Sequence, residues 1–132
     1  MKYFDFNATT PLSSLAEEVW IKTNREYWQN PSSPYGPSAR AKNLLESLRE
    51  RFAAILSCQS NNIVFNSGAT EGNNAVIDYF AKNSLPHSRI LISAIEHPSV
   101  LKAAENTFLE KADFIPVSAS GVVEIAKLRS LI

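Results

Sequence analysis

The sequence of 132 residues has little of several residue types, and each scarcity excludes something. Because Cys58 is the one cysteine, an internal disulfide is excluded, and such cysteine usage fits a reducing compartment. Basic and acidic residues number 13 each, so charge indicates neither a nucleic-acid nor an anionic-membrane partner. No apolar run reaches membrane-spanning length, and the stretch from Met1 to Asp5 lacks the apolar core of a signal peptide. We therefore expect a cytoplasmic protein.

Several familiar site motifs are also missing. The chain contains neither Gly-x-x-x-x-Gly-Lys nor Gly-x-Gly-x-x-Gly, so neither the P-loop nor the dinucleotide fingerprint applies. His87 and His97, with a single cysteine, do not make a metal site, and Cys58 is interpreted as structural. A hydrophobic content of 45% with 20% charged residues is that of one globular domain.

Hydrophobic periodicity predicts alternating helices and strands. We expect Trp20 and Trp28 to anchor the core and Ser38 to be a helix N-cap. Strands are expected at 63–65, 89–94 and 113–117, and helices over 13–28, from Ser38 to about Leu56, after Thr70 and from Glu124. A further helix is expected with Pro98 or Ser99 near its first position, and its apolar stripe is Val100, Leu101, Ala104 and Phe108. This order predicts an α/β fold with a doubly wound, mostly parallel sheet. With three strands and no strand after the last helix, it predicts the incomplete, N-terminal part of a larger domain.

The most informative stretch runs from Asn62 to Asn74. The apolar residues 63–65 end in a turn at Ser67 and Gly68, and a helix follows. Gly68 allows a sharp bend, Thr70 is expected as N-cap, and Glu71 suits the positive end of the helix dipole. Free N–H groups at such an end can bind a phosphate. The alternative interpretation is a well-capped connection without a ligand.

A second polar feature, Glu96-His97-Pro98, follows the strand expected over 89–94. Ligands of open α/β sheets bind beyond the carboxyl ends of the strands, so this feature and the Gly68 turn are expected to face one crevice. A phosphate at the turn and an imidazole nearby would suit a flat, phosphorylated ring. Alternatively, His97 is a surface or cap residue.

Four blocks together resemble the start of the class V, fold-type-I pyridoxal-phosphate enzymes, specifically the cysteine desulfurases. The blocks are Tyr3-Phe4-Asp5-Phe6-Asn7-Ala8-Thr9-Thr10-Pro11, Asn30-Pro31-Ser32-Ser33, residues 65–74, and Glu96-His97-Pro98-Ser99-Val100. Their order and spacing are similar to those of the family over nearly the whole chain. Where many relatives have a histidine after the Asn-Pro-Ser-Ser motif, this chain has Pro34-Tyr35-Gly36, so the subgroup stays open.

The resemblance implies pyridoxal 5'-phosphate as cofactor. It implies that Gly68, Ala69 and Thr70 bind the phosphate, that His97 stacks on the ring and assists proton transfer, and that Asn7 lies on the substrate side. It further implies conversion of L-cysteine to L-alanine with the sulfur held as an enzyme persulfide for iron–sulfur cluster or thiocofactor assembly. A homodimer and a sulfur-acceptor protein are the implied partners. Residues 1–37 would form an N-terminal arm, helix and loop, and residues 38–132 the first part of the cofactor-binding large domain.

The family's Schiff-base lysine, the aspartate that pairs with the pyridine nitrogen and the sulfur-accepting cysteine lie beyond the region matched. We therefore expect the chain alone to be inactive. In the family topology the second and third strands are neighbours, while the first strand pairs elsewhere. Two alternatives stay open. One is another class V reaction, such as selenocysteine lyase or an aminotransferase. The other is a non-catalytic α/β module that needs a partner chain.

Overall fold

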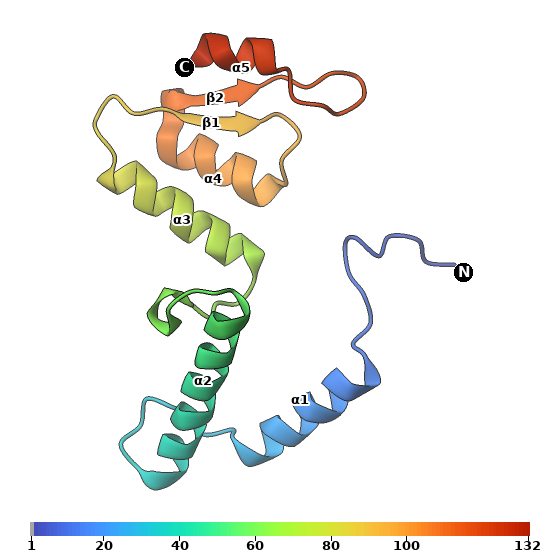
Figure 1. Ribbon diagram of the computed structural model, residues 1–132, viewed down its shortest axis with the longest axis vertical. Coiled ribbons are helices and arrows are strands. Elements are labelled where there is room, and N and C mark those ends of the chain that lie inside the picture. The colour runs from blue at the N-terminus through green and yellow to red at the C-terminus, as the bar shows by residue number, and fades with distance from the viewer. Residues whose placement is uncertain (1) are drawn as a thin grey trace. The chain divides into compact units, whose positions relative to one another are not determined.

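The structure is a computed structural model that describes residues 2–132, and the chain divides into two compact units at Val64 and Phe65. Figure 1 shows the order of elements along the chain. They are α1 (Ser14–Glu26), α2 (Gly36–Ile55), η1 (Ser60–Asn62), α3 (Ala69–Asn83), β1 (Ile90–Ser93), α4 (Pro98–Phe108), η2 (Leu109–Lys111), β2 (Ala112–Ile115) and α5 (Ile125–Leu131). The predicted domain boundary after residue 37 is not tested by this division and stays a prediction.

The first unit contains α1, α2 and η1. Helix α1 begins where the sequence predicted, because the Ser13 hydroxyl accepts from the Ala16 N–H at 3.2 Å. The predicted core role of the two tryptophans is wrong for this chain, since Trp20 is 63% and Trp28 is 75% exposed. Helix α1 has no buried residue. Its apolar side chains are therefore covered only in part by the described chain, with Ile21 38% and Leu15 71% exposed.

Helix α2 starts earlier than predicted. Tyr35 is its N-cap, and Pro37 lies in its first turn, where a missing N–H costs nothing. Ser38 is consequently inside the helix and fully buried, so its predicted N-cap role is wrong.

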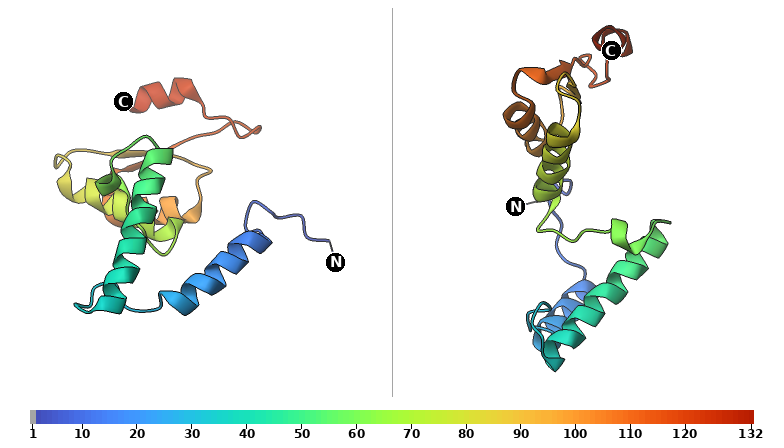
Figure 2. Two further views of the ribbon diagram at one scale, coloured as in Figure 1. Left: turned by 60° about the horizontal axis from the view of Figure 1, so that its bottom comes forward. Right: turned by 90° about the vertical axis from the view of Figure 1, so that its left-hand side faces the viewer.

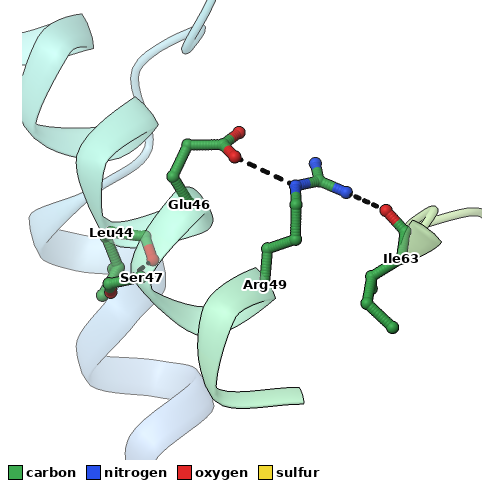
Figure 3. A network of polar contacts seen from close by, with 5 residues as sticks. All are labelled: Leu44, Glu46, Ser47, Arg49 and Ile63. Atoms are coloured by element: carbon green, nitrogen blue, oxygen red, sulfur yellow. Dashed lines mark hydrogen bonds and ion pairs between the residues drawn. The ribbon is translucent and has the colours of Figure 1, made fainter. Parts of the chain in front are cut away.

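Arg49 of α2 ties this helix to the segment that leads into the Gly68 turn. Its Nε donates to Glu46 Oε2 at 3.0 Å, and a terminal nitrogen of the same guanidinium donates to the Ile63 carbonyl (Figure 3). The Ser47 hydroxyl, in the same view, donates to the Leu44 carbonyl at 2.8 Å. One planar guanidinium thus holds a helix and an extended segment together.

The second unit is an α/β layer built on a short parallel sheet. Strand β1 pairs with β2 in parallel, with Ile90 opposite Ala112 and Ser93 opposite Ile115. Helix α4 crosses from one strand to the other and packs on both, while α5 contacts β2 (Figures 1 and 2). The mixed α/β class and the adjacency of these two strands, both predicted, are confirmed.

The core of this unit lies where α3, α4 and β1 meet. Its buried members are Ile77, Ile92, Ala103, Ala104 and Phe108. All four residues of the apolar stripe predicted for α4 belong to this cluster: Ala104 and Phe108 are buried, and Val100 and Leu101 are partly buried against them. Ala103 is buried as well, although it was not predicted.

The predicted strand at 63–65 is absent from the sheet of the described chain. Ile63 has extended backbone angles (φ −96°, ψ 121°), but strand pairing within residues 2–132 is confined to β1, β2 and one isolated bridge between Val117 and Val123. A strand needs a hydrogen-bonded neighbour, and β propensity alone supplies none. None of the described helices is long and apolar enough to cross a membrane.

Candidate functional site

The site is built first from the turn that precedes α3. The Asn66 side-chain oxygen accepts from the Gly68 N–H at 3.0 Å, which closes a tight local turn. Gly68 then has φ +151° and ψ 177°, a conformation that is nearly exclusive to glycine. Gly68 is also the N-cap, so Thr70 is the second helical residue and its predicted N-cap role is wrong. The turn, not a capping hydroxyl, sets where the helix begins.

Glu71 fastens this turn to the first turn of α3. Its Oε2 accepts from the Ser67 N–H at 2.8 Å and from the Ser67 hydroxyl at 2.6 Å. These two hydrogen bonds, the side-chain one foremost, lower the pKa of Glu71. The carboxylate is therefore charged and directed at Ser67, in the manner of the acidic member of a capping box.

The remaining donors at this end are backbone amides. The first bond of the helical ladder runs from the Gly72 N–H to the Gly68 carbonyl at 3.2 Å. The N–H groups of Ala69, Thr70 and Glu71 precede that bond, so the helix itself offers them no acceptor. Ala69 and Thr70 are exposed, and Thr70 adds a hydroxyl. This set of donors at the positive end of a helix suits an anion.

His97 lies at the start of the neighbouring helix. It is the N-cap of α4, and its Nδ1 accepts from the Ser99 N–H at 3.1 Å and lies 2.8 Å from the Ser99 hydroxyl. Pro98 follows as the first helical residue, as predicted. The alternative interpretation of His97 as a cap residue is therefore confirmed. The imidazole is exposed, so its capping contact leaves the ring accessible.

One hydrogen bond joins the two features. The Asn73 side-chain amide, one turn into α3, donates to the Ser99 hydroxyl at 2.9 Å. Figure 1 shows α3 and α4 side by side with their N-termini at the same end, where β1 also ends. The structure thus brings Gly68, Ala69 and Thr70 to the same end of one layer as His97. A groove of about 620 Å³ beside α3 is lined in part by Ser67, Thr70 and Asn74; His97 is not among its lining residues.

Two further predicted features lie in the first unit. Asn7 is in a turn where the Ala8 N–H donates to the Asp5 carbonyl at 3.1 Å, and its substrate-side role stays a prediction. Asn30 closes its loop by accepting from the Ser32 N–H at 2.9 Å. Cys58 is exposed. In residues 2–132 no group of three or more His, Cys, Asp or Glu side chains is placed to hold a metal ion.

The sequence analysis missed Asn73 and Ser99 as site residues. Both lie inside the quoted blocks, but a contact between residues 26 positions apart requires the packing of α3 on α4. The only sequence signal was an asparagine on the first turns of one helix and a serine after the Pro98 start of another.

Comparison with known proteins decides the family. Residues 2–132 match the family described as "Aminotransferase class-V". The chain belongs to this family.

Class-V relatives are similar over nearly all of this chain. It is 35% identical to "Cysteine desulfurase IscS 1" of Archaeoglobus fulgidus over 95% of its own length and 34% of that relative. It is 33% identical to "Selenocysteine lyase" of Homo sapiens, over 93% of this chain and 33% of that relative. The chain thus spans about a third of the length of these curated relatives.

Two solved structures share the fold of this chain. A protein described as "NIFS-LIKE PROTEIN" superposes with a TM-score of 0.86 at 33% identity, over 98% of this chain and 36% of that one. "SspA in complex with cysteine" gives a TM-score of 0.81 at 30% identity, over 100% of this chain and 39% of that one. The predicted resemblance and the predicted fold class, a portion of a fold-type-I large domain, are confirmed.

The class-V family uses pyridoxal phosphate, as predicted. The residues of this chain fit such a group. The amides that start α3 and the Thr70 hydroxyl are suitable donors for a phosphate, while the Glu71 carboxylate is bound to Ser67. His97 offers a flat, exposed ring at the start of the next helix.

Proposed function

We propose that this chain forms the phosphate-binding and ring-stacking side of the active site of a pyridoxal-phosphate-dependent cysteine desulfurase. One observation carries the proposal: the Asn73–Ser99 hydrogen bond joins the helix that offers free amides to the helix that His97 caps. A phosphate and an attached ring need both features at one end of the same layer. Similarity to relatives named cysteine desulfurase supports the reaction.

Each residue has a definite task in this proposal. Gly68 bends the chain so that the amides of Ala69 and Thr70 hold the phosphate, and the Thr70 hydroxyl adds a donor. His97 stacks on the pyridine ring and moves a proton at its free nitrogen. The cofactor, when bound, supplies an electron sink, and the protein binds and orients it. Asn7 is assigned to the substrate side on its motif alone.

The complete reaction would convert L-cysteine to L-alanine and leave the sulfur as an enzyme persulfide. We propose a homodimer and a sulfur-acceptor protein as partners and the cytoplasm as the location. The covalent lysine is assigned to a part of the protein outside these 132 residues. Three lysines present here support this assignment because they form surface ion pairs: Lys82 with Asp78 at 2.6 Å, Lys102 with Glu105 at 2.7 Å and Lys127 with Glu124 at 2.8 Å. We expect the chain alone to release no sulfide from cysteine.

A selenocysteine lyase is the second candidate, because relatives of that name are 33–34% identical to this chain. The proposed site residues hold the cofactor, and both reactions use that cofactor in the same way. Alanine formation by the complete protein from cysteine and from selenocysteine, measured side by side, separates the two candidates.

A non-catalytic module that needs a partner chain is the third candidate. It is favoured by large exposed apolar side chains in the first unit, including Trp20, Trp28 and Ile55, which is 77% exposed. Sedimentation of the purified chain tests it: a stable monomer would contradict this candidate.

The test of the main proposal is cofactor binding by the purified chain, followed by ³¹P NMR. We expect a saturable change in the phosphate signal of pyridoxal phosphate. Thr70→Val should weaken binding roughly 10- to 150-fold, because a hydrogen bond to a charged group contributes about 1.5–3 kcal/mol. Thr23→Val, the same exchange in helix α1 and outside the four blocks, is the matched control and should have no effect.

The ring contact is tested separately. His97→Ala should weaken binding about 2- to 10-fold, from a stacking contribution of about 0.5–1.5 kcal/mol, while His87→Ala in an exposed loop should not. Equal effects of the two histidine variants, or binding that ignores both Thr70 and His97, would refute the proposed site. Borohydride reduction followed by peptide mapping should find no modified lysine in this chain.

A further inference from the structure

We propose that Asn73 and Ser99 are positioning residues that hold the imidazole of His97 in one orientation and with its proton on Nε2. The consequence for catalysis depends on the function proposed above, whereas the test does not. Neither residue is expected to touch the substrate or cofactor, because both act through the ring of His97.

The directions of the hydrogen bonds follow from the donors available. The Asn73 side-chain nitrogen can only donate, so the Ser99 oxygen accepts at 2.9 Å. The hydrogen of the Ser99 hydroxyl is then free to point at His97 Nδ1, 2.8 Å away. The Ser99 N–H donates to the same Nδ1 at 3.1 Å. Two donors from one residue therefore converge on Nδ1.

A ring nitrogen that accepts a hydrogen bond carries no proton. In the neutral imidazole one nitrogen donates and the other accepts, so an accepting Nδ1 leaves the proton on Nε2. Two donors at different positions of Ser99 also restrict rotation of the ring. His97 thus presents an N–H at the nitrogen that the helix does not use.

Burial gives this arrangement its strength. Ser99 is 9% exposed, and a buried hydroxyl is costly unless it is hydrogen-bonded. Asn73 is half-buried and reaches Ser99 from the packed face of α3. The neighbouring Asn74 is exposed and bonds its own helix, to the Thr70 carbonyl at 2.8 Å. The two adjacent asparagines therefore have different tasks, and the comparison between them isolates the contact with Ser99.

A plain helix-capping role for His97 makes a different prediction. Capping requires Nδ1 and the Ser99 N–H alone, and it would survive loss of the Asn73 amide. The positioning role requires the hydroxyl, which Asn73 orients. Ser99→Ala and Asn73→Ala should therefore change the ring of His97 under the proposal and leave it unchanged if it only caps the helix.

The experiment is ¹⁵N NMR of the histidine rings in the whole chain without cofactor, recorded in alkaline buffer. His87 lies in an exposed loop and is an internal reference. In the wild type we expect the two ring nitrogens of His97 to report at least a tenfold excess of the Nε2–H form over the Nδ1–H form. His87 should show the mixture of an ordinary solvated ring.

Variants give the second readout. Asn73→Ala and Ser99→Ala should shift the ring-nitrogen signals of His97 toward those of His87. Ser99→Thr retains the hydroxyl and should keep the wild-type signals. Asn74→Ala should leave the signals of His97 unchanged. A His97 whose nitrogens match those of His87 in the wild type would overturn the proposal without any variant. Unchanged signals in folded Asn73→Ala would overturn it as well. An Nε2–H ring in a chain that binds no pyridoxal phosphate would refute the proposed function and leave this inference intact.

Discussion

The conformation of Gly68 leads to a prediction that can be worked through from the structure. At φ +151° an L side chain is strained, although an added Cβ would meet no atom within 4 Å. Gly68→Ala should therefore destabilise the second unit by conformation alone, by about 1–3 kcal/mol. This corresponds to a roughly 5- to 150-fold change in the unfolding equilibrium.

Gly36→Ala is the matched control. A Cβ at Gly36 also meets nothing within 4 Å, and its φ lies in the ordinary range. Because Gly36 begins α2, alanine there should stabilise by about 0.4–1 kcal/mol. Urea unfolding followed by circular dichroism measures both variants against the wild type. The same substitution should thus have opposite signs at two equally open positions.

A mirror-image residue separates strain from the mere presence of a methyl group. D-alanine accepts the backbone angles of Gly68, and Cys58 provides a ligation point for a synthetic segment 58–132. The chain with D-alanine at position 68 should unfold like the wild type and keep the amides of Ala69 and Thr70 in place. If L-alanine at position 68 were as stable as the wild type, the proposed role of this glycine in setting the start of α3 would be refuted.

Three more outcomes follow from the second unit. Ile92→Val should cost about 0.5–1.5 kcal/mol and Ile92→Ala about 2–5 in urea unfolding, because Ile92 is 5% exposed in the α3–α4–β1 core. Asp113→Asn should destabilise the second unit at neutral pH more than Asp78→Asn does. A side-chain hydrogen bond from Arg89 lowers the pKa of Asp113. The stabilisation from this pair is therefore present above pH 3.8 and is lost as the pH falls through the lower pKa of the folded state. Glu71→Gln should also destabilise the second unit at neutral pH, since the pKa of Glu71 is also lowered. In acid titrations the difference in stability from the wild type should disappear below pH 4.5.

The parts of the fold that depend on local sequence were predictable. The Ser13 cap, the Pro98 start of α4 and the apolar stripe of α4 all follow from neighbouring residues. The adjacency of β1 and β2 was predicted because the family places its second and third strands side by side. The two helix starts and the stripe need no information from distant parts of the chain, whereas the adjacency of the strands was an implication of the family resemblance.

The wrong predictions depend on distant partners. Residues 63–65 have the composition of a strand, but pairing is a property of two segments, and strand pairing within residues 2–132 is confined to β1, β2 and the Val117–Val123 bridge. Trp20 and Trp28 are hydrophobic, yet burial requires a surface to pack against. Ser38 was displaced from the N-cap because Pro37 is compatible with a helix that starts earlier.

The site shows the same division between local and distant information. The donors that start α3 follow from the Gly68 turn, and the position of His97 follows from the Pro98 that comes after it. What joins them is the hydroxyl of Ser99, which the motif alone does not distinguish from any helix-start serine. Its burial and its two partners, from α3 and from the N-cap of α4, make it the residue through which a change in α3 would reach the imidazole. A mild substitution on the packed face of α3 near Asn73 should therefore change the ¹⁵N signals of the His97 ring while the stability of α4 is still unchanged.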